Sequence, residues 1–288
     1  MRYLVGGLVP FVFVTHSAIA AMACDRACLI ETATMLAAGG DAGGARITEN
    51  GDVVEAGATW GAGASDIVVH NAYADADRGQ VMVVGTGTGA DGAPAIFGLR
   101  AKVEDGAATE MEWMVTRDGE ASLFPREIPL ATDAQFDEVV PEGRRATPER
   151  MVELANTYFD GIEMTDGSAL PVAEDCNRVE NGIQMTHSER FPDMHCNSLG
   201  LFAYIPRVEQ RRFPIIDEER GVVVAIVMFQ IPEADIERTR NGETTVRHYD
   251  PRSLYLFEAF KVADDQVQQI EATMRDLEFE KVIDWSGE

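Results

Sequence analysis

The same series of local patterns occurs twice along this chain, in residues 24–117 and again in residues 147–288. Each series begins with a helix-like stretch, passes an Asn-Gly turn signal and a strand–turn–strand signature, and ends in two alternating strands. The matching landmarks are Asn50-Gly51 and Asn181-Gly182, then Arg78-Gly79 and Arg220-Gly221. The repetition predicts two similar units, each a helix followed by a sheet.

An α+β fold is therefore expected, with two tandem cone-shaped repeats in which helices pack on a curved antiparallel sheet. Helices would close over the concave face and leave an apolar pocket. Residues 118–146 are interpreted as a linker because they hold three prolines, an acidic run and little periodicity. The repeat in 147–288 holds more ionisable side chains, so we expect the active pocket there and treat 24–117 as a degenerate copy.

Residues 1–23 have the form of an export signal. Arg2 precedes an apolar run, and small residues end it in Ala21-Met22-Ala23. The apolar run is too short to span a bilayer comfortably, which disfavours a membrane anchor. The protein is therefore expected to be exported, either periplasmic or secreted, with no membrane insertion after the signal is removed.

The charge is strongly acidic, with 49 Asp and Glu residues against 24 Lys and Arg residues. Such a surface repels phosphates, so no nucleic acid partner is expected. Phosphate loops, dinucleotide fingerprints and serine nucleophile elbows do not occur in the sequence. We expect a small organic ligand, no cofactor and no metal, and either pairing of the two repeats within the chain or a homodimer.

The four cysteines favour disulfides, because an even number in an exported chain is typical of paired thiols. They are Cys24, Cys28, Cys176 and Cys196. The favoured pairs are Cys176–Cys196 and Cys24–Cys28. The rival interpretation is a zinc site made by Cys176, Cys196, His187 and His195, although no CxxC or HExxH spacing supports it.

Several segments carry a resemblance to known families. They are Tyr158-Phe159-Asp160-Gly161-Ile162-Glu163, Pro171 to Cys176, Arg178-Val179-Glu180-Asn181-Gly182 and Arg211 to Gly221. The first two resemble the first long helix and the following segment of SnoaL-like, nuclear-transport-factor-two-like proteins. Nearly the whole mature chain also resembles a family of secreted bacterial and fungal proteins with a domain of unknown function. The resemblance implies a cone-shaped fold whose members include cofactor-free enzymes and plain binding modules, so it does not fix a reaction.

Two carboxylates are candidate catalysts. The resemblance places an acid at the position of Asp175 at a pocket mouth, where apolar walls raise a carboxyl pKa, although a turn cap is the alternative role. Glu258 shares a strand face with apolar neighbours, and the corresponding residue of the first repeat is Leu99. A lone acid there is costly unless it is paired. The alternatives for Glu258 are an ion pair with a nearby arginine or a strand whose other face points inward.

Other candidates come from the same repeat. Tyr158 lies on the apolar face of its helix, either as a donor to substrate or as a core tyrosine. His187, in an inserted loop that could act as a lid, is a candidate proton carrier or a solvated histidine. The substrate-binding candidates are Arg178, Glu180, His195 and Arg211. Arg178 and Glu180 could instead pair with each other across a strand.

Together these residues predict a cofactor-independent lyase, dehydratase or isomerase that acts by proton transfer on a small, mostly apolar organic molecule. The alternative is a non-catalytic binding module for a hydrophobic ligand or a partner protein. A metal-dependent hydrolase that uses His187, His195 and the cysteines is the third hypothesis.

Overall fold

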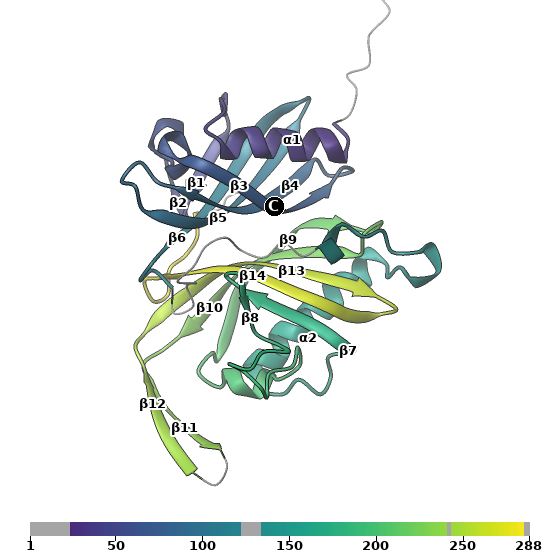
Figure 1. Cartoon of the computed structure of the whole chain (residues 1–288), viewed down its shortest axis with the longest axis vertical. Coiled ribbons are helices and arrows are strands. Elements are labelled where there is room, and N and C mark those ends of the chain that lie inside the picture. The colour runs from purple at the N-terminus through teal and green to yellow at the C-terminus, as the bar shows by residue number, and fades with distance from the viewer. Residues whose placement is uncertain (1–23, 122–133, 241–242, 285–288) are drawn as a thin grey trace, which may run out of the picture.

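The structure is a computed structural model that describes residues 24–121, 134–240 and 243–284 (Figure 1). The export signal predicted for residues 1–23 lies outside the described residues. Residues 122–133 of the predicted linker also lie outside them. No helix in the described part of the chain is long and apolar enough to cross a membrane.

The first half combines one α-helix with a six-stranded sheet. Helix α1 (Arg26–Ala37) begins after Asp25, whose side chain accepts a hydrogen bond from the backbone N–H of Cys28. The strands are β1 (Arg46–Glu49), β2 (Asp52–Val53), β3 (Ser65–Asp75), β4 (Gln80–Thr88), β5 (Pro94–Glu104) and β6 (Ala107–Arg117). They lie in the order β2-β1-β6-β5-β4-β3, and β1 pairs parallel to β6.

The second half has the same order of elements. Helix α2 (Pro148–Met164) begins after Thr147, whose hydroxyl accepts a hydrogen bond from the N–H of Arg150. The strands are β7 (Val172–Glu180), β8 (Ile183–Gln184), β9 (Arg207–Asp217), β10 (Val222–Ile231), β13 (Arg252–Ala263) and β14 (Gln266–Leu277). Their order, β8-β7-β14-β13-β10-β9, matches that of the first sheet, and β7 pairs parallel to β14.

Between β10 and β13 the chain forms a two-stranded hairpin that projects from the body of the molecule (Figure 1). Its strands are β11 (Ala234–Arg240) and β12 (Glu243–Tyr249). Short 3-10 turns complete the described elements, at Ala56–Ala58, Trp60–Gly63, Ala134–Asp137, Glu142–Arg144 and Leu199–Phe202. In the first sheet the equivalent connection, from Thr88 to Pro94, is a short turn.

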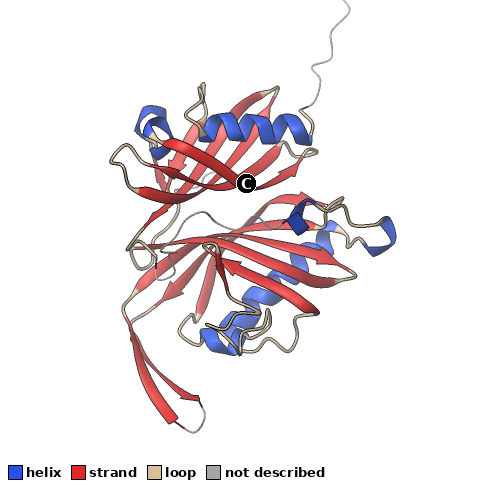
Figure 2. Cartoon of the chain, in the orientation of Figure 1, coloured by secondary structure: helices blue, strands red, loops and turns tan. Residues whose placement is uncertain are grey.

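The expectation of an α+β fold with helices packed on antiparallel sheets is wrong. The described residues are 48% strand and 19% helix, and they contain two α-helices, one on each sheet (Figure 2). Neither sheet is wholly antiparallel, because β1 and β7 each pair parallel to a neighbour. Each half of the sequence has one segment of helical period, so most residues satisfy their backbone hydrogen bonds in long strand pairs.

The two sheets face each other, and α1 and α2 lie on their outer sides (Figure 1). Glu112 and Glu271 are buried between the sheets. Arg212 and Tyr255 of the second half donate hydrogen bonds to Glu112. Asn71 and Tyr73 of the first half donate to Glu271. Each half thus supplies the partners for the other half's buried carboxylate.

Candidate functional site

Glu258 lies on the face of β13 that is turned toward α2. Leu256 and Phe260, which share this face, belong to the same apolar cluster as Tyr158 of α2. Tyr255 and Phe257 point the other way and pack between the two sheets. Both faces of β13 are therefore buried, and the carboxylate of Glu258, 0% exposed, lies inside the second half.

Three other polar side chains gather around Glu258. Tyr158 is 0% exposed, and Arg178 and Glu180 of β7 are 3% and 4% exposed. Arg178 Nη2 lies 2.5 Å from Glu180 Oε1, so these two side chains form a buried ion pair, which was the alternative role expected for them. The guanidinium carbon of Arg178 lies 5.4 Å from the ring centre of Tyr158. We name Tyr158, Arg178, Glu180 and Glu258 the Glu258 cluster.

The Glu258 cluster contains several polar atoms that are buried without a hydrogen-bond partner among the described residues. They are both carboxylate oxygens of Glu258, the hydroxyl of Tyr158, and Nε and Nη1 of Arg178. A buried donor or acceptor left unpaired costs about 1–3 kcal/mol of folding free energy. The fold therefore maintains unpaired donors and acceptors next to each other in its interior.

Burial changes the ionisation of both acidic groups. Removal from water raises the pKa of Glu258 to about 7, although the charge of Arg178 lowers that pKa and the charge of Glu180 raises it. Tyr158 also lowers the pKa of Glu258, but the pair does not reach standard hydrogen-bond geometry. Burial raises the pKa of Tyr158 well above 10. Glu258 can thus exchange a proton near neutral pH while Tyr158 keeps its own.

The residues that pair with Glu258 on the neighbouring strands are small. In the strand register it lies between Ala225 of β10 and Ala272 of β14. At the equivalent place in the first sheet, Leu99 lies between Val83 and Trp113.

Large side chains fill the interior of the first half. The ring of Trp113 lies 6.0 Å from that of Trp60 and 5.8 Å from that of Phe97. The second half replaces this indole by the methyl group of Ala272 and places a carboxylate beside it. The two halves therefore share a strand order and differ in what occupies their interiors.

Asp175 does not join the Glu258 cluster. Its side chain is exposed, and it alternates along β7 with Cys176 and Arg178, so it points to the opposite face of the strand. The structure therefore brings two of the predicted catalytic residues together, Glu258 and Tyr158, and leaves Asp175 apart from them.

The predicted loop and arginine residues also lie outside the Glu258 cluster. His187 and His195 are exposed, and a ring nitrogen of His187 lies 3.2 Å from the carbonyl oxygen of Cys176. Arg211 of β9 donates to Asp160 at 2.6 Å and to Glu163 at 3.0 Å. These contacts attach β9 to α2, so Arg211 has a structural role in the second half.

Both predicted disulfides are present, Cys24–Cys28 and Cys176–Cys196. The second bond uses the two thiols that the zinc hypothesis needed as thiolate ligands. Among the described residues, no group of three or more His, Cys, Asp or Glu side chains is arranged to hold a metal ion.

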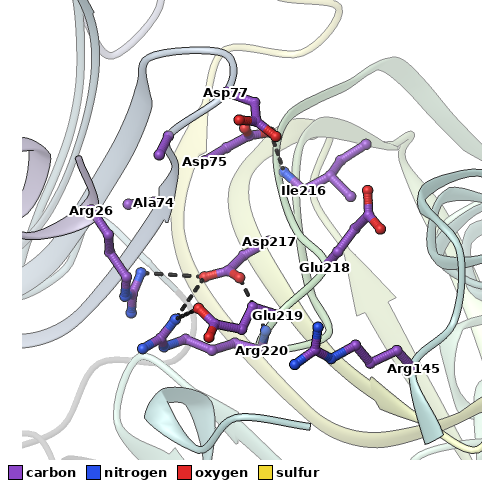
Figure 3. Close-up of a pocket in the computed structure, with 11 residues that line it drawn as sticks. Arg26, Ala74, Asp75, Asp77, Arg145, Ile216, Asp217, Glu218, Glu219 and Arg220 are labelled. Atoms are coloured by element: carbon purple, nitrogen blue, oxygen red, sulfur yellow. Dashed lines mark hydrogen bonds and ion pairs between the residues drawn. The ribbon is translucent and has the colours of Figure 1, made fainter. Parts of the chain in front are cut away.

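A surface cavity of about 300 Å3 lies where the β3–β4 and β9–β10 turns meet (Figure 3). Several of its charges are paired: Arg26 contacts Asp217 at 3.3 Å, and Arg220 contacts Glu219 at 2.9 Å. Asp75 accepts a hydrogen bond from the N–H of Ile216. None of the residues that line this cavity belongs to the Glu258 cluster. The ion pair between Arg26 and Asp217 joins the two halves of the molecule.

No sequence pattern marks Tyr204, whose ring lies 6.2 Å from that of Phe202 at the edge of the Glu258 cluster. It is partly buried, and burial together with the charge of Glu180 raises its pKa to about 12. The ring of Tyr204 stacks on that of Tyr249, with ring centres 4.2 Å apart. Tyr204 lies in an irregular segment, where neither strand nor helix period marks it as buried.

Comparisons with solved structures give low similarity. A protein from Sphaerobacter thermophilus is 16% identical, with a TM-score of 0.27 over 44% of this chain and 94% of that one. A candidate isomerase from Bacillus subtilis is 8% identical, with a TM-score of 0.30 over 44% and 87%. A Methylobium petroleophilum PM1 protein of unknown function with a cystatin-like fold is 11% identical, with a TM-score of 0.28 over 48% and 84%.

No curated protein matches the chain. One protein family does match part of it. Residues 144–274 match the family described as Domain of unknown function (DUF8021), and this range includes all four residues of the Glu258 cluster.

Proposed function

We propose that the Glu258 cluster binds a small, mostly apolar organic molecule and transforms it by proton transfer, as a cofactor-independent lyase, dehydratase or isomerase. The observation that carries this proposal is the set of buried polar atoms without partners on Tyr158, Arg178 and Glu258. A bound molecule with matching polar atoms would satisfy them, which turns an unfavourable interior into a binding site.

The proposed chemistry assigns one role to each side chain. Ionised Glu258 accepts a proton from a carbon next to a carbonyl group and returns it at another position or to a leaving group. Tyr158, whose pKa lies well above 10, and Arg178 donate hydrogen bonds to the oxygen that gains negative charge. Glu180 balances the charge of Arg178 and holds its guanidinium in place.

The first half supports this proposal by contrast. The same strand order there accommodates Leu99 in place of Glu258, so the fold does not need an acid at this position. An interior carboxylate with no partner lowers stability, and such costs are typical of functional sites.

We propose that the protein is exported and that its halves, 24–117 and 147–288, arose by duplication. Two disulfides support an oxidising compartment, and the shared strand order of the two sheets supports duplication.

The test compares the wild type with Glu258→Leu, which installs the residue of the first half, and Glu258→Gln, which keeps the side-chain shape. Each protein is incubated with a metabolite extract, and bound molecules are identified by native mass spectrometry. We expect the wild type to retain a small molecule that Glu258→Leu does not bind, while circular dichroism shows that both are folded. Conversion of that molecule by the wild type and not by Glu258→Gln would support catalysis.

Two outcomes contradict the proposal in different ways. Binding of the same molecule by Glu258→Leu with unchanged affinity removes the Glu258 cluster as the site. If the wild type releases the bound molecule chemically unchanged at every pH tested, the protein is a non-catalytic binding module.

A further inference from the structure

The segment 196–204 packs against the Glu258 cluster and is held by different means at its two ends. At one end, Cys196 is bonded to Cys176 of β7. In the middle, the ring of Phe202 lies 4.8 Å from the guanidinium carbon of Arg178. At the other end, Tyr204 is attached without a covalent bond, through its parallel stack on Tyr249 of β12.

The projecting β11–β12 hairpin supplies the contacts at this second end. Arg238 Nη2 donates to the carbonyl oxygen of Leu201 at 2.7 Å and to the hydroxyl of Tyr249 at 3.1 Å. The guanidinium carbon of Arg238 also lies 5.9 Å from the ring centre of Tyr204. One arginine of the hairpin therefore holds both the segment and the tyrosine on which Tyr204 stacks.

Tyr204 lies at the edge of the Glu258 cluster, because its ring centre is 6.2 Å from that of Phe202, which packs on Arg178. It is partly exposed, whereas Phe202, two residues earlier, is 8% exposed. Glu180 and Arg178 both influence the ionisation of the Tyr204 hydroxyl, which places it within electrostatic reach of the cluster. A molecule that moves from solvent to Glu258 past this edge would have to displace Tyr204.

We propose that Tyr204 is the gate of the Glu258 cluster and determines which ligands enter by their size, and that Arg238 and Tyr249 hold the gate closed. The segment 197–204 opens away from the hairpin, with the disulfide at Cys196 as its fixed end. The gate rests on the proposed function of the Glu258 cluster. Within residues 24–121 the β4–β5 connection forms no such hairpin, and a packed aromatic interior needs no gate.

Hydrogen–deuterium exchange of the full chain tests the opening without any ligand. The N–H groups of Ser198, Leu201 and Ile205 donate to carbonyl oxygens in the segment or at its ends, so opening of the segment exposes them. We expect Tyr204→Ala and Arg238→Gln to raise the exchange rate of these amides about three- to tenfold. The reason is that each variant loses one aromatic stack or hydrogen bond that holds the segment closed. Tyr204→Phe, which keeps the stacked ring, should exchange as the wild type does.

A neutral fluorescent dye, Nile red, tests entry. We expect its fluorescence to rise with Tyr204→Ala at pH 7 and to fall again when Ala272→Trp is added, because the indole fills the interior as Trp113 does in the first half. Circular dichroism and the melting temperature show whether this double variant is folded. If it is not, Ala225→Val, which installs the first-half residue Val83, replaces Ala272→Trp as the filling substitution.

Some results would overturn the gate. A uniform rise of exchange that includes β10 and β13 would show that Tyr204 only stabilises the fold. Equal dye entry into the wild type and Tyr204→Ala would show that Tyr204 does not control access. Hydrogen exchange needs no ligand, so the proposal of a gate and the proposal of a ligand site can be contradicted separately. Glu258→Leu tests the ligand site, and Tyr204→Ala tests the gate.

Discussion

Glu258 on β13 lies directly opposite Ala272 on β14, so the buried carboxylate has a methyl group as its neighbour on this strand. The equivalent pair in the first sheet is Leu99 and Trp113, in which the indole fills the same place. The two halves share a strand order, and this replacement of a large side chain by a small one next to an acid distinguishes their interiors.

The stability of the protein should depend on pH through Glu258. Its pKa rises from 4.5 in the unfolded chain to about 7 in the fold, so the folded state binds more protons between these values. The free energy of unfolding should therefore fall by about 3 kcal/mol as pH rises from 4.5 to 7. Urea unfolding at several pH values measures this slope.

Two variants of Glu258 serve as controls for that slope. Glu258→Gln and Glu258→Leu cannot titrate, so both should lose this part of the pH dependence. Glu258→Leu should also be more stable than the wild type at pH 7, by roughly 1–3 kcal/mol, because an apolar side chain replaces an unpaired charge. An identical slope in all three proteins would show that Glu258 keeps an ordinary pKa.

Tyr158→Phe should preserve the fold and impair the site. The hydroxyl of Tyr158 has no hydrogen-bond partner among the described residues, so its removal should change the free energy of unfolding by less than about 1 kcal/mol. Because Tyr158 lowers the pKa of Glu258, the stability decrease attributed to Glu258 should continue to a higher pH in this variant. Ligand binding, measured by native mass spectrometry, should weaken.

Asp175→Asn is the matched control for Tyr158→Phe, since Asp175 is exposed and points away from the Glu258 cluster. We expect a stability change within about 0.5 kcal/mol and unchanged ligand binding. A loss of binding in Asp175→Asn alone would move the site to the outer face of β7.

Glu112→Ala should destabilise the whole molecule. Glu112 is 0% exposed and accepts hydrogen bonds from Arg212 and Tyr255 across the interface of the two halves. Its removal takes away an acceptor that both donors share inside the interface and should cost about 3 kcal/mol. Chemical unfolding, followed by fluorescence and circular dichroism, should show a single transition, because both halves share the interface. Two separate transitions in the wild type would show that the halves fold independently.

Loss of the disulfide between Cys176 and Cys196 should lower stability more than loss of the other one. The Cys176–Cys196 bond has a sequence separation of 20 residues and the Cys24–Cys28 bond a separation of 4. Loop-closure entropy then predicts costs of about 3 and about 2 kcal/mol. Urea unfolding of the two paired Cys→Ala variants measures both values. The reverse order would indicate that contacts around the cysteines, and not chain entropy, set the effect.

Local patterns in the sequence predicted much of the second half correctly. The helix after Thr147 and Pro148 is present with its expected cap, and both disulfide pairs were identified from number and context. Glu258 was singled out because it interrupts an apolar strand face, which is a short-range pattern. Such features depend on neighbouring residues, so they can be read without the fold.

Other predictions failed because they depended on contacts between distant segments. The α+β expectation assigned more helix than the chain forms, since each half holds one α-helix against a six-stranded sheet. Asp175 was placed in the pocket by resemblance, but strand alternation turns it outward. No local pattern marks Glu112 and Glu271 as buried, because only the packing of the two sheets against each other buries them.

The sequence by itself determined that the chain repeats one order of elements, where α2 begins, and that a carboxylate interrupts an apolar strand at Glu258. Only the tertiary structure decided that buried, unpaired polar atoms of Tyr158, Arg178 and Glu258 meet within the described residues, and that small residues pair with the acid on both neighbouring strands. It also decided that the hairpin holds Tyr204, whose ring lies near that of Phe202 beside Arg178. The physical reason is that secondary-structure propensity and hydrophobic periodicity depend only on a few neighbouring residues. Burial and the pairing of charges depend on strands and loops that lie far apart in the chain.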